Sequence, residues 1–308
     1  MRTPEQTTNA GHATQHEAHD HAHDGGLQAD LDTLARHRAS RRRWLGLLTA
    51  GGVAPLALLA CGGGGSDAGT TTTTSSGSTT TGGTTTGGST SSGTCSVIPE
   101  ETAGPYPGDG SNSVNGSVAN ALSLSGIVRS DITSSIGGAT GTANGVPLTI
   151  TLTLVNTGNS CASLEGYAIY LWHCDRSGKY SMYSSGITDQ NYLRGVQATN
   201  ASGQVTFTTI VPGCYDGRMT HMHFEVYPSL STASIASNKI KTSQLTFPMD
   251  MLNTVYAQSG YETSVSNLAR ISYSTDNVFS DGVSTQTTTV SGSVAAGYSA
   301  TLQVGISV

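Results

Sequence analysis

The stretch PLTITLTLV, which runs from Pro147 to Val155, alternates aliphatic residues with threonines. Successive side chains of a β-strand point to opposite faces, so this period of two predicts a strand with one apolar and one polar face. Similar short runs, separated by clusters of Gly, Asn, Asp and Ser, continue from residue 95 to residue 308. We therefore expect an all-β domain over residues 95–308.

Short runs of this kind define the predicted architecture. The candidate strands are Leu122–Val128, Pro147–Val155, Tyr167–Trp172, Gln204–Val211, Thr220–Tyr227, Leu245–Pro248, Gln286–Val294 and Thr301–Val308. About eight short strands joined by turns are typical of a β-sandwich. A single short helix is expected over Asp250–Gln258, where apolar residues recur at helical spacing after Pro248.

The composition argues against several classes of protein. Charged residues make up 11% of the 308 residues, aromatic residues make up 6%, and the formal net charge is -6. The scarcity of charges and the strand patterning argue against coiled coils and helical repeats. A chain with a net negative charge is not expected to bind nucleic acid through its phosphates.

The amino-terminal region carries signals for export. The stretch SRRRWL, Ser40–Leu45, leads into an apolar run that ends at Ala60 and is too short and interrupted for a spanning helix. Paired arginines before such a run resemble a twin-arginine signal, and Leu-Leu-Ala-Cys ending at Cys61 resembles a lipobox. We predict that residues 1–60 are removed and that Cys61 carries a lipid. The protein would then be an exported lipoprotein that faces the periplasm or the cell exterior and touches the membrane only through that lipid.

Two biased segments lie on either side of that signal. The first is a histidine-rich tract with His12, His16, His19, His21 and His23. Such tracts can bind metals, but this one lies upstream of the predicted cleavage, so we interpret it as part of a disordered leader. Residues 61–94 are almost wholly Gly, Ser and Thr, which predicts a flexible linker between the lipid and the folded domain.

Four cysteines remain in the predicted domain: Cys95, Cys161, Cys174 and Cys214. An even number of cysteines in an exported chain predicts two disulfides, and three pairings are open. A zinc site built from these cysteines is not favoured because the chain has no Cys-x-x-Cys spacing.

The chemistry of the domain centres on His221 and His223. Residues two apart on a strand share a face, so the two imidazoles form a ready pair of metal ligands. Glu225 would extend the same face and allow a site of two histidines and one carboxylate. Tyr215 and Tyr180 offer a different set, because phenolate is a hard, anionic donor that favours Fe(III).

Two segments carry a specific resemblance. Ala168–Tyr180 and Pro212–Phe224 resemble the iron-site signatures of the intradiol ring-cleavage dioxygenases, the family of protocatechuate 3,4-dioxygenase and catechol 1,2-dioxygenase. Further similarity lies in Pro99–Pro107, in Tyr192–Gly195 with Gly203–Gly213, and in Asp276–Gly282. The resemblance spans most of residues 95–297.

The resemblance implies a ligand set for non-haem Fe(III). The implied metal ligands are Tyr180, Tyr215, His221 and His223. Tyr180 would stay on the metal, and Tyr215 would leave it when the substrate binds. Arg218 would stabilise negative charge on the substrate ring, and Gln244 would lie near the same face if residues 228–243 are an insertion.

The implied reaction cleaves the bond between the two hydroxylated carbons of a catechol with O2, giving a cis,cis-muconate-type dicarboxylate.

The sequence does not predict the ring substituents or the oligomeric state. Its short spacing between Tyr215 and His221 differs from that of many family members and predicts a more open site. The alternative is a non-catalytic, lipid-anchored β-sandwich that binds aromatics or polysaccharide.

Overall fold

A computed structural model describes residues 95–308 of the chain. The predictions for the export signal, the histidine-rich tract, the lipid on Cys61 and the linker over residues 61–94 lie outside the described residues. Among the described residues, no helix is long and apolar enough to cross a membrane.

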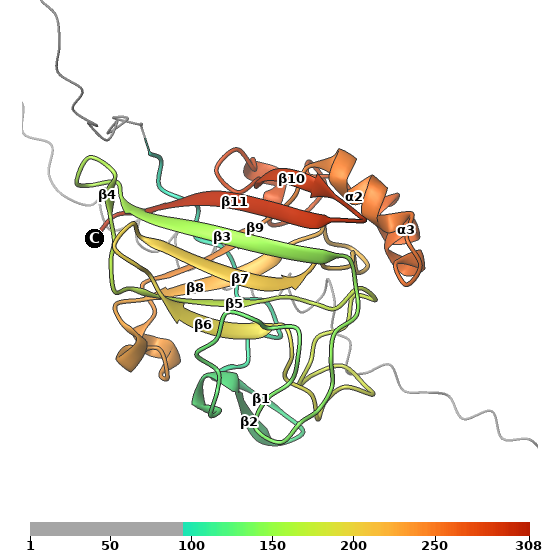
Figure 1. The fold of residues 1–308 in the computed structure, drawn as a ribbon, viewed down its shortest axis with the longest axis horizontal. Coiled ribbons are helices and arrows are strands. Elements are labelled where there is room, and N and C mark those ends of the chain that lie inside the picture. The colour runs from blue at the N-terminus through green and yellow to red at the C-terminus, as the bar shows by residue number, and fades with distance from the viewer. Residues whose placement is uncertain (1–94) are drawn as a thin grey trace, which may run out of the picture.

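The domain is an all-β sandwich, as predicted, and two sheets form most of it (Figure 1). The first sheet has the order β10-β11-β3-β4, and β7 pairs with β3 as well. Its strands are β3 Pro147–Asn156, β4 Ala162–Ser163, β7 Gln204–Ile210, β10 Thr289–Ser293 and β11 Gly297–Ile306. β11 and β3 run parallel over nine register pairs, from Tyr298 opposite Leu148 to Ile306 opposite Asn156, and the other pairs are antiparallel.

The second sheet is antiparallel and has the order β6-β5-β8-β9. Its strands are β5 Ala168–Trp172, β6 Arg194–Ala198, β8 Met222–Tyr227 and β9 Lys241–Leu245. In its register, His223 lies between Trp172 of β5 and Gln244 of β9. This sheet therefore positions the segments that carry the resemblance next to one another.

The main core lies between the two sheets. Leu148, Ile150, Leu152 and Leu154 of β3 are buried, and the intervening residues of the strand are only partly buried or exposed. β5 and β8 are instead buried on both faces. One face joins the aliphatic core, and the other lies in a separate aromatic cluster that includes Tyr170, Trp172, Tyr180 and Tyr227.

Shorter elements complete the domain. They are the hairpin β1 Asp109–Val114 and β2 Ser117–Asn120, the 3-10 helices η1 Ala121–Ser123, η2 Leu230–Thr232, η3 Ala236–Asn238 and η4 Phe279–Asp281, and the helices α2 Met249–Tyr256 and α3 Glu262–Leu268. Figure 1 shows α2 and α3 side by side at one end of the sandwich.

Three predictions of secondary structure are wrong. Leu122–Val128 is not a strand: it overlaps the end of η1 and contains a turn at Gly126, whose φ of 88° interrupts an extended run. The strand predicted over Leu245–Pro248 lies earlier, at β9, because polar residues there pair with β8. The single helix predicted near the carboxyl terminus is two helices, since α3 follows α2 after a turn at Gly260.

Residues 95–108, which we call the strap, run from the end of β11 to the second sheet. The Ile98 N–H donates to the Gly305 carbonyl at 2.8 Å, and the Glu101 N–H donates to the Thr242 carbonyl at 2.9 Å. The Thr102 carbonyl accepts a hydrogen bond from Gln244 Nε2 at 2.9 Å. The strap thus lies along both sheets and ends beside the aromatic cluster.

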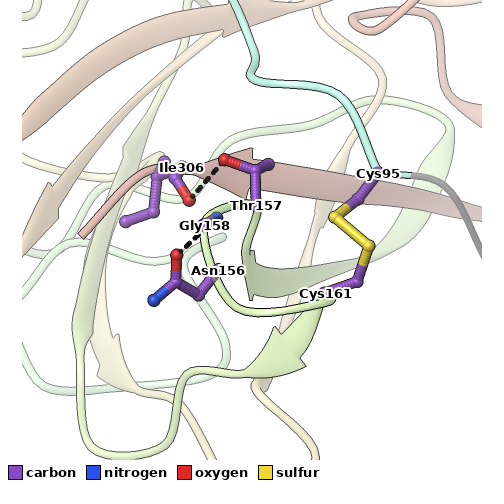
Figure 2. Close-up of a disulfide and its surroundings, with 6 residues drawn as sticks. All are labelled: Cys95, Asn156, Thr157, Gly158, Cys161 and Ile306. Carbon is purple, nitrogen blue, oxygen red and sulfur yellow. Dashed lines mark hydrogen bonds between the residues drawn. A yellow bond between two sulfur atoms is a disulfide. The ribbon is translucent and has the colours of Figure 1, made fainter.

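A disulfide fixes the start of the strap. Cys95 is bonded to Cys161, 66 residues later, beside the Asn156–Gly158 turn between β3 and β4 (Figure 2). The prediction of two disulfides is wrong, because Cys174 and Cys214 are free, buried thiols. Each thiol donates to a backbone carbonyl, at 3.4 Å to Gly213 and 3.2 Å to Arg218 respectively, and burial raises the pKa of Cys214 to about 11.

Candidate metal centre

The four predicted ligands lie in or immediately before β8 and in two loops next to it. His221 immediately precedes β8 and His223 lies within it, so both side chains point to the aromatic face of the second sheet. Tyr180 follows β5, the neighbour of β8, and Tyr215 lies in the loop that joins β7 to β8. The pairing of β5 with β8 therefore brings together residues that are up to 43 positions apart in sequence, as between Tyr180 and His223.

The donor atoms of these four residues converge. His221 Nε2 lies 3.1 Å from His223 Nε2, 3.3 Å from Tyr215 Oη and 3.5 Å from Tyr180 Oη. Donors held at about 2.0 to 2.1 Å from one first-row metal ion are separated by about 3 to 3.5 Å. The distances from His221 Nε2 to the other three donor atoms are therefore those expected around a single metal ion.

The histidines are held in the form that binds a metal. His221 Nδ1 lies 2.6 Å from the Met219 carbonyl, which can only accept, so the proton is assigned to Nδ1 and the Nε2 lone pair faces the other donors. Burial, reinforced by the positive charge of Arg218, holds the pKa of His221 well below its usual value. Burial, followed by the charges of His221 and Arg218, does the same to the pKa of His223.

Aromatic contacts orient both kinds of donor. The His223 ring stacks on Trp172, with centroids 4.9 Å apart and planes within 5°. The Tyr180 ring lies 4.9 Å from the Tyr106 ring of the strap and meets the Tyr215 ring edge to face at 6.0 Å. These contacts limit the rotation of the side chains that carry the donor atoms.

The turn before Tyr180 needs a glycine. Asp175 Oδ1 accepts hydrogen bonds from the Ser177 and Lys179 N–H groups, which closes the turn. Gly178 within it has a φ of 84°, and a Cβ added there would lie 3.0 Å from Tyr215 Cβ. The absent side chain at Gly178 therefore lets the Tyr180 turn approach the Tyr215 loop.

Arg218 and Gln244 lie close to the two histidines. The Arg218 side chain is fully buried, and its Nε is 3.0 Å from Asp276 Oδ2. Arg218 Nη2 donates to Gln244 Oε1 at 2.7 Å, and Gln244 lies opposite His223 in the register. Gln244 in turn bonds to Thr102 of the strap.

Sequence reasoning missed Asp276 as the partner of Arg218. Its carboxylate also accepts the N–H groups of Met219, Val278 and Phe279, so it fixes the loop that carries Arg218 to the loop before η4. The signal for this role was the resemblance of Asp276–Gly282 to a family segment. The contact itself spans 58 positions and is not visible in the local pattern.

Glu225, the alternative ligand, belongs to a separate cluster. Its Oε1 accepts a hydrogen bond from Lys239 Nζ at 2.7 Å, and its Oε2 accepts one from Tyr227 at 2.7 Å. Lys239 also contacts Asp109 at 3.0 Å, and burial raises the pKa of Glu225 to about 7. In the described part of the chain, no group of three or more His, Cys, Asp or Glu residues could hold a metal.

Comparison with known proteins shows what this domain is similar to. Residues 130–277 match the family model described as Dioxygenase. The fold is similar to an intradiol ring-cleavage dioxygenase from Tetranychus urticae, with a TM-score of 0.52 and 25% identity, covering 69% of this chain and 95% of that one. The dioxygenase domain of a carbohydrate-binding fusion protein from Streptomyces sp. SirexAA-E gives a TM-score of 0.43 and 23% identity, covering 69% and 99% of the two chains.

No curated protein sequence matches this chain. The match to the dioxygenase model and the structural similarity agree with the motifs found in the sequence. The domain is therefore similar to the intradiol ring-cleavage dioxygenases in both sequence and fold.

Proposed function

We propose that the protein is a non-haem, Fe(III)-dependent intradiol dioxygenase. It would cleave the bond between the two hydroxylated carbons of a catechol with O2 and give a cis,cis-muconate-type dicarboxylate. The observation that carries this proposal is the convergence of two tyrosines and two histidines, with the donor atoms of Tyr180, Tyr215 and His223 between 3.1 and 3.5 Å from His221 Nε2.

The donor set supports iron in the ferric state. Tyr180, Tyr215, His221 and His223 would hold the ion, and two phenolates are hard, anionic ligands that favour Fe(III) over softer or divalent metals. When bound, ferric iron would supply Lewis acidity and a template for the two oxygens of a catecholate.

The two tyrosines are suited to different roles. Tyr180 is 1% exposed and its ring packs against the strap, so it is suited to remain in place throughout the reaction. Tyr215 is only partly buried and lies in a loop, so its side chain can move aside. We propose that Tyr215 Oη takes up a proton from one catechol hydroxyl and that Tyr180 stays as a fixed ligand.

Arg218 supplies positive charge where the substrate becomes more negative. Its guanidinium is held by Asp276 and Gln244, so it does not have to reorganise when charge develops on the ring. Fixed charge of this kind stabilises a transition state more than a mobile side chain does. Gln244 acts through Arg218 and keeps that guanidinium in position.

Export is a second part of the proposal. The twin-arginine-like signal and Cys61 motif predict a lipoprotein outside the cytoplasm, and the Cys95–Cys161 disulfide is consistent with an oxidising compartment. We expect Cys61→Ala to move the protein from the membrane fraction to the soluble fraction. Membrane retention of that variant would contradict the lipid anchor.

Oxygen uptake by the purified, iron-replete protein tests the proposed activity directly. With a panel of catechols, we expect uptake of one O2 per catechol and formation of the ring-opened dicarboxylate. A protein that binds catechol but consumes no O2 would contradict the enzyme and favour the non-catalytic binding module.

A further inference from the structure

Arg194, the first residue of β6, is a buried cation whose partners are all neutral. It is 1% exposed, and its guanidinium uses every N–H donor it has. The acceptors are the Ser181 hydroxyl at 3.2 Å, the Ser181 carbonyl at 2.9 Å, the Pro107 carbonyl at 2.7 Å, the Tyr106 carbonyl at 3.0 Å and the Tyr170 hydroxyl at 3.2 Å. None of them is a carboxylate.

Four of these five acceptors lie on two segments that meet at the candidate metal centre, and the fifth, the Tyr170 hydroxyl, lies on β5. Tyr106 and Pro107 belong to the strap, and Ser181 directly follows Tyr180. The Tyr106 ring in turn lies 4.9 Å from the Tyr180 ring. A single guanidinium thus fixes the backbone on both sides of the contact between these two tyrosines.

Burying the Arg194 cation among neutral acceptors costs folding stability. A buried cation without a counter-ion loses hydration that neutral acceptors only partly replace, and an apolar side chain of similar volume is often as stable or more so. The planar fork of arginine holds five acceptors in fixed directions, whereas lysine has three donors and no fixed plane. The geometry therefore requires arginine and not merely a positive charge.

We propose that Arg194 is a positioning residue that sets the orientation of Tyr180 as a metal ligand and of the Tyr106 ring that packs against it. The inference rests on the proposed ferric site and deepens it. Arg194 does not touch the donor atoms in the described contacts, so it would act through the Ser181 and Tyr106 backbone.

The test compares the wild-type protein with Arg194→Lys, each loaded with iron. We expect Arg194→Lys to keep its iron through the two histidines, while the visible tyrosinate-to-Fe(III) band per bound iron shifts or falls by half or more. A displacement of a reacting group by about 1 Å can cost on the order of 100-fold in rate, so kcat for catechol should fall by about that factor.

Arg129→Lys is the matched control. The Arg129 guanidinium also donates to backbone carbonyls, those of Arg194, Ser134 and Asn191, with the Arg194 carbonyl 2.6 Å from Nη2. Its side chain lies against Gly195, on the opposite face of β6. We expect this variant to lose stability and to keep the wild-type band. If both variants lose the band only in proportion to unfolded protein, Arg194 has a purely structural role and the inference is wrong.

Ser181→Ala keeps the inference testable if Arg194→Lys does not fold. It removes only the hydroxyl that accepts from Arg194 and donates to the Tyr192 carbonyl at 2.7 Å. We expect a smaller shift of the same band, and an unchanged band would overturn the inference. A wild-type protein without any tyrosinate band would instead overturn the ferric site itself, so the two failures are distinct.

Discussion

The two faces of β8 are equally buried but chemically opposite. Phe224 and Val226 point into the aliphatic core at 0% exposure, while His223 and Glu225 point into the aromatic cluster at 2% and 0%. On the apolar face, burial stabilises the fold by removing hydrocarbon from water. On the other face, the same burial disfavours the charged forms of the side chains. It holds two histidines neutral and raises the pKa of Glu225 to about 7. Equal burial therefore supports the fold on one face and sets the chemistry on the other.

The largest effect should come from His223→Ala on the polar face. Changes outside the ligand shell cost metal sites about 10- to 100-fold, so removal of a ligand should cost more than about 100-fold in activity. Iron content and oxygen uptake measure the effect. A variant that keeps full iron and activity would show that His223 is not a ligand.

Arg218→Gln should spare the metal and slow the reaction. Removal of one preorganised charge or donor typically lowers kcat by about 100- to 1000-fold. We expect iron content within the range of the wild type and a loss confined mainly to kcat. An equal loss of bound iron would mean that Arg218 supports the site rather than the reaction.

Phe224→Ala tests the apolar face of the same strand. Truncation of a buried phenylalanine costs about 3 to 5 kcal/mol of unfolding free energy. Urea unfolding of the metal-free protein measures that loss. The folded fraction should keep the wild-type absorption per iron, and a changed spectrum would mean that the two faces are not independent.

The double variant Cys95→Ser and Cys161→Ser tests what the disulfide at the start of the strap contributes. Loss of a disulfide typically costs about 2 to 4 kcal/mol, so the midpoint of unfolding should fall. Because this bond lies at the start of the strap and Arg194 holds its end, catechol cleavage at low temperature should change little. A large loss of kcat in fully folded protein would show that the disulfide at the start of the strap also affects the metal centre.

The smallest expected effect is the change of folding stability with pH. The pKa values of the three buried histidines, His173, His221 and His223, are lowered in the folded protein, so the unfolded chain binds more protons once the pH falls below about 6.5. The stability contributed by neutral burial is present above that pH and is lost as the pH falls towards the lowered pKa values. The raised pKa of Glu225 has the opposite effect, because its contribution to stability falls as the pH rises towards about 7. Denaturant titrations of the metal-free Glu225→Gln variant remove that contribution and leave the effect of the histidines. Stability that does not fall with acidification would contradict the burial of neutral histidines.

The predictability of each region follows from how local its pattern is. β3 was predicted because one of its faces is partly open, which leaves an alternating sequence. β9 was misplaced because Lys241-Thr-Ser-Gln244 is polar, and these residues form a strand only through pairing with β8. The convergence of Tyr180 with His221 followed from a family resemblance, and the structure brings the two together across the pairing of β5 with β8.

Contacts between distant segments could not be read from the sequence. The partnership of Arg218 with Asp276 and that of Arg194 with the strap join residues 58 and 87 to 88 positions apart. The same limit applies to the cysteines, since their pairing depends on where the strap meets the turn after β3. Local patterns indicated which residues carry the chemistry, and the topology determined which of them meet.

The visible absorption spectrum of the purified, iron-replete protein, recorded before and after catechol is added without oxygen, tests the central claim most directly. We predict a reddish tyrosinate-to-Fe(III) band that moves to longer wavelength when catechol binds. A colourless protein with iron bound would contradict the tyrosine ligands and the proposed reaction with them.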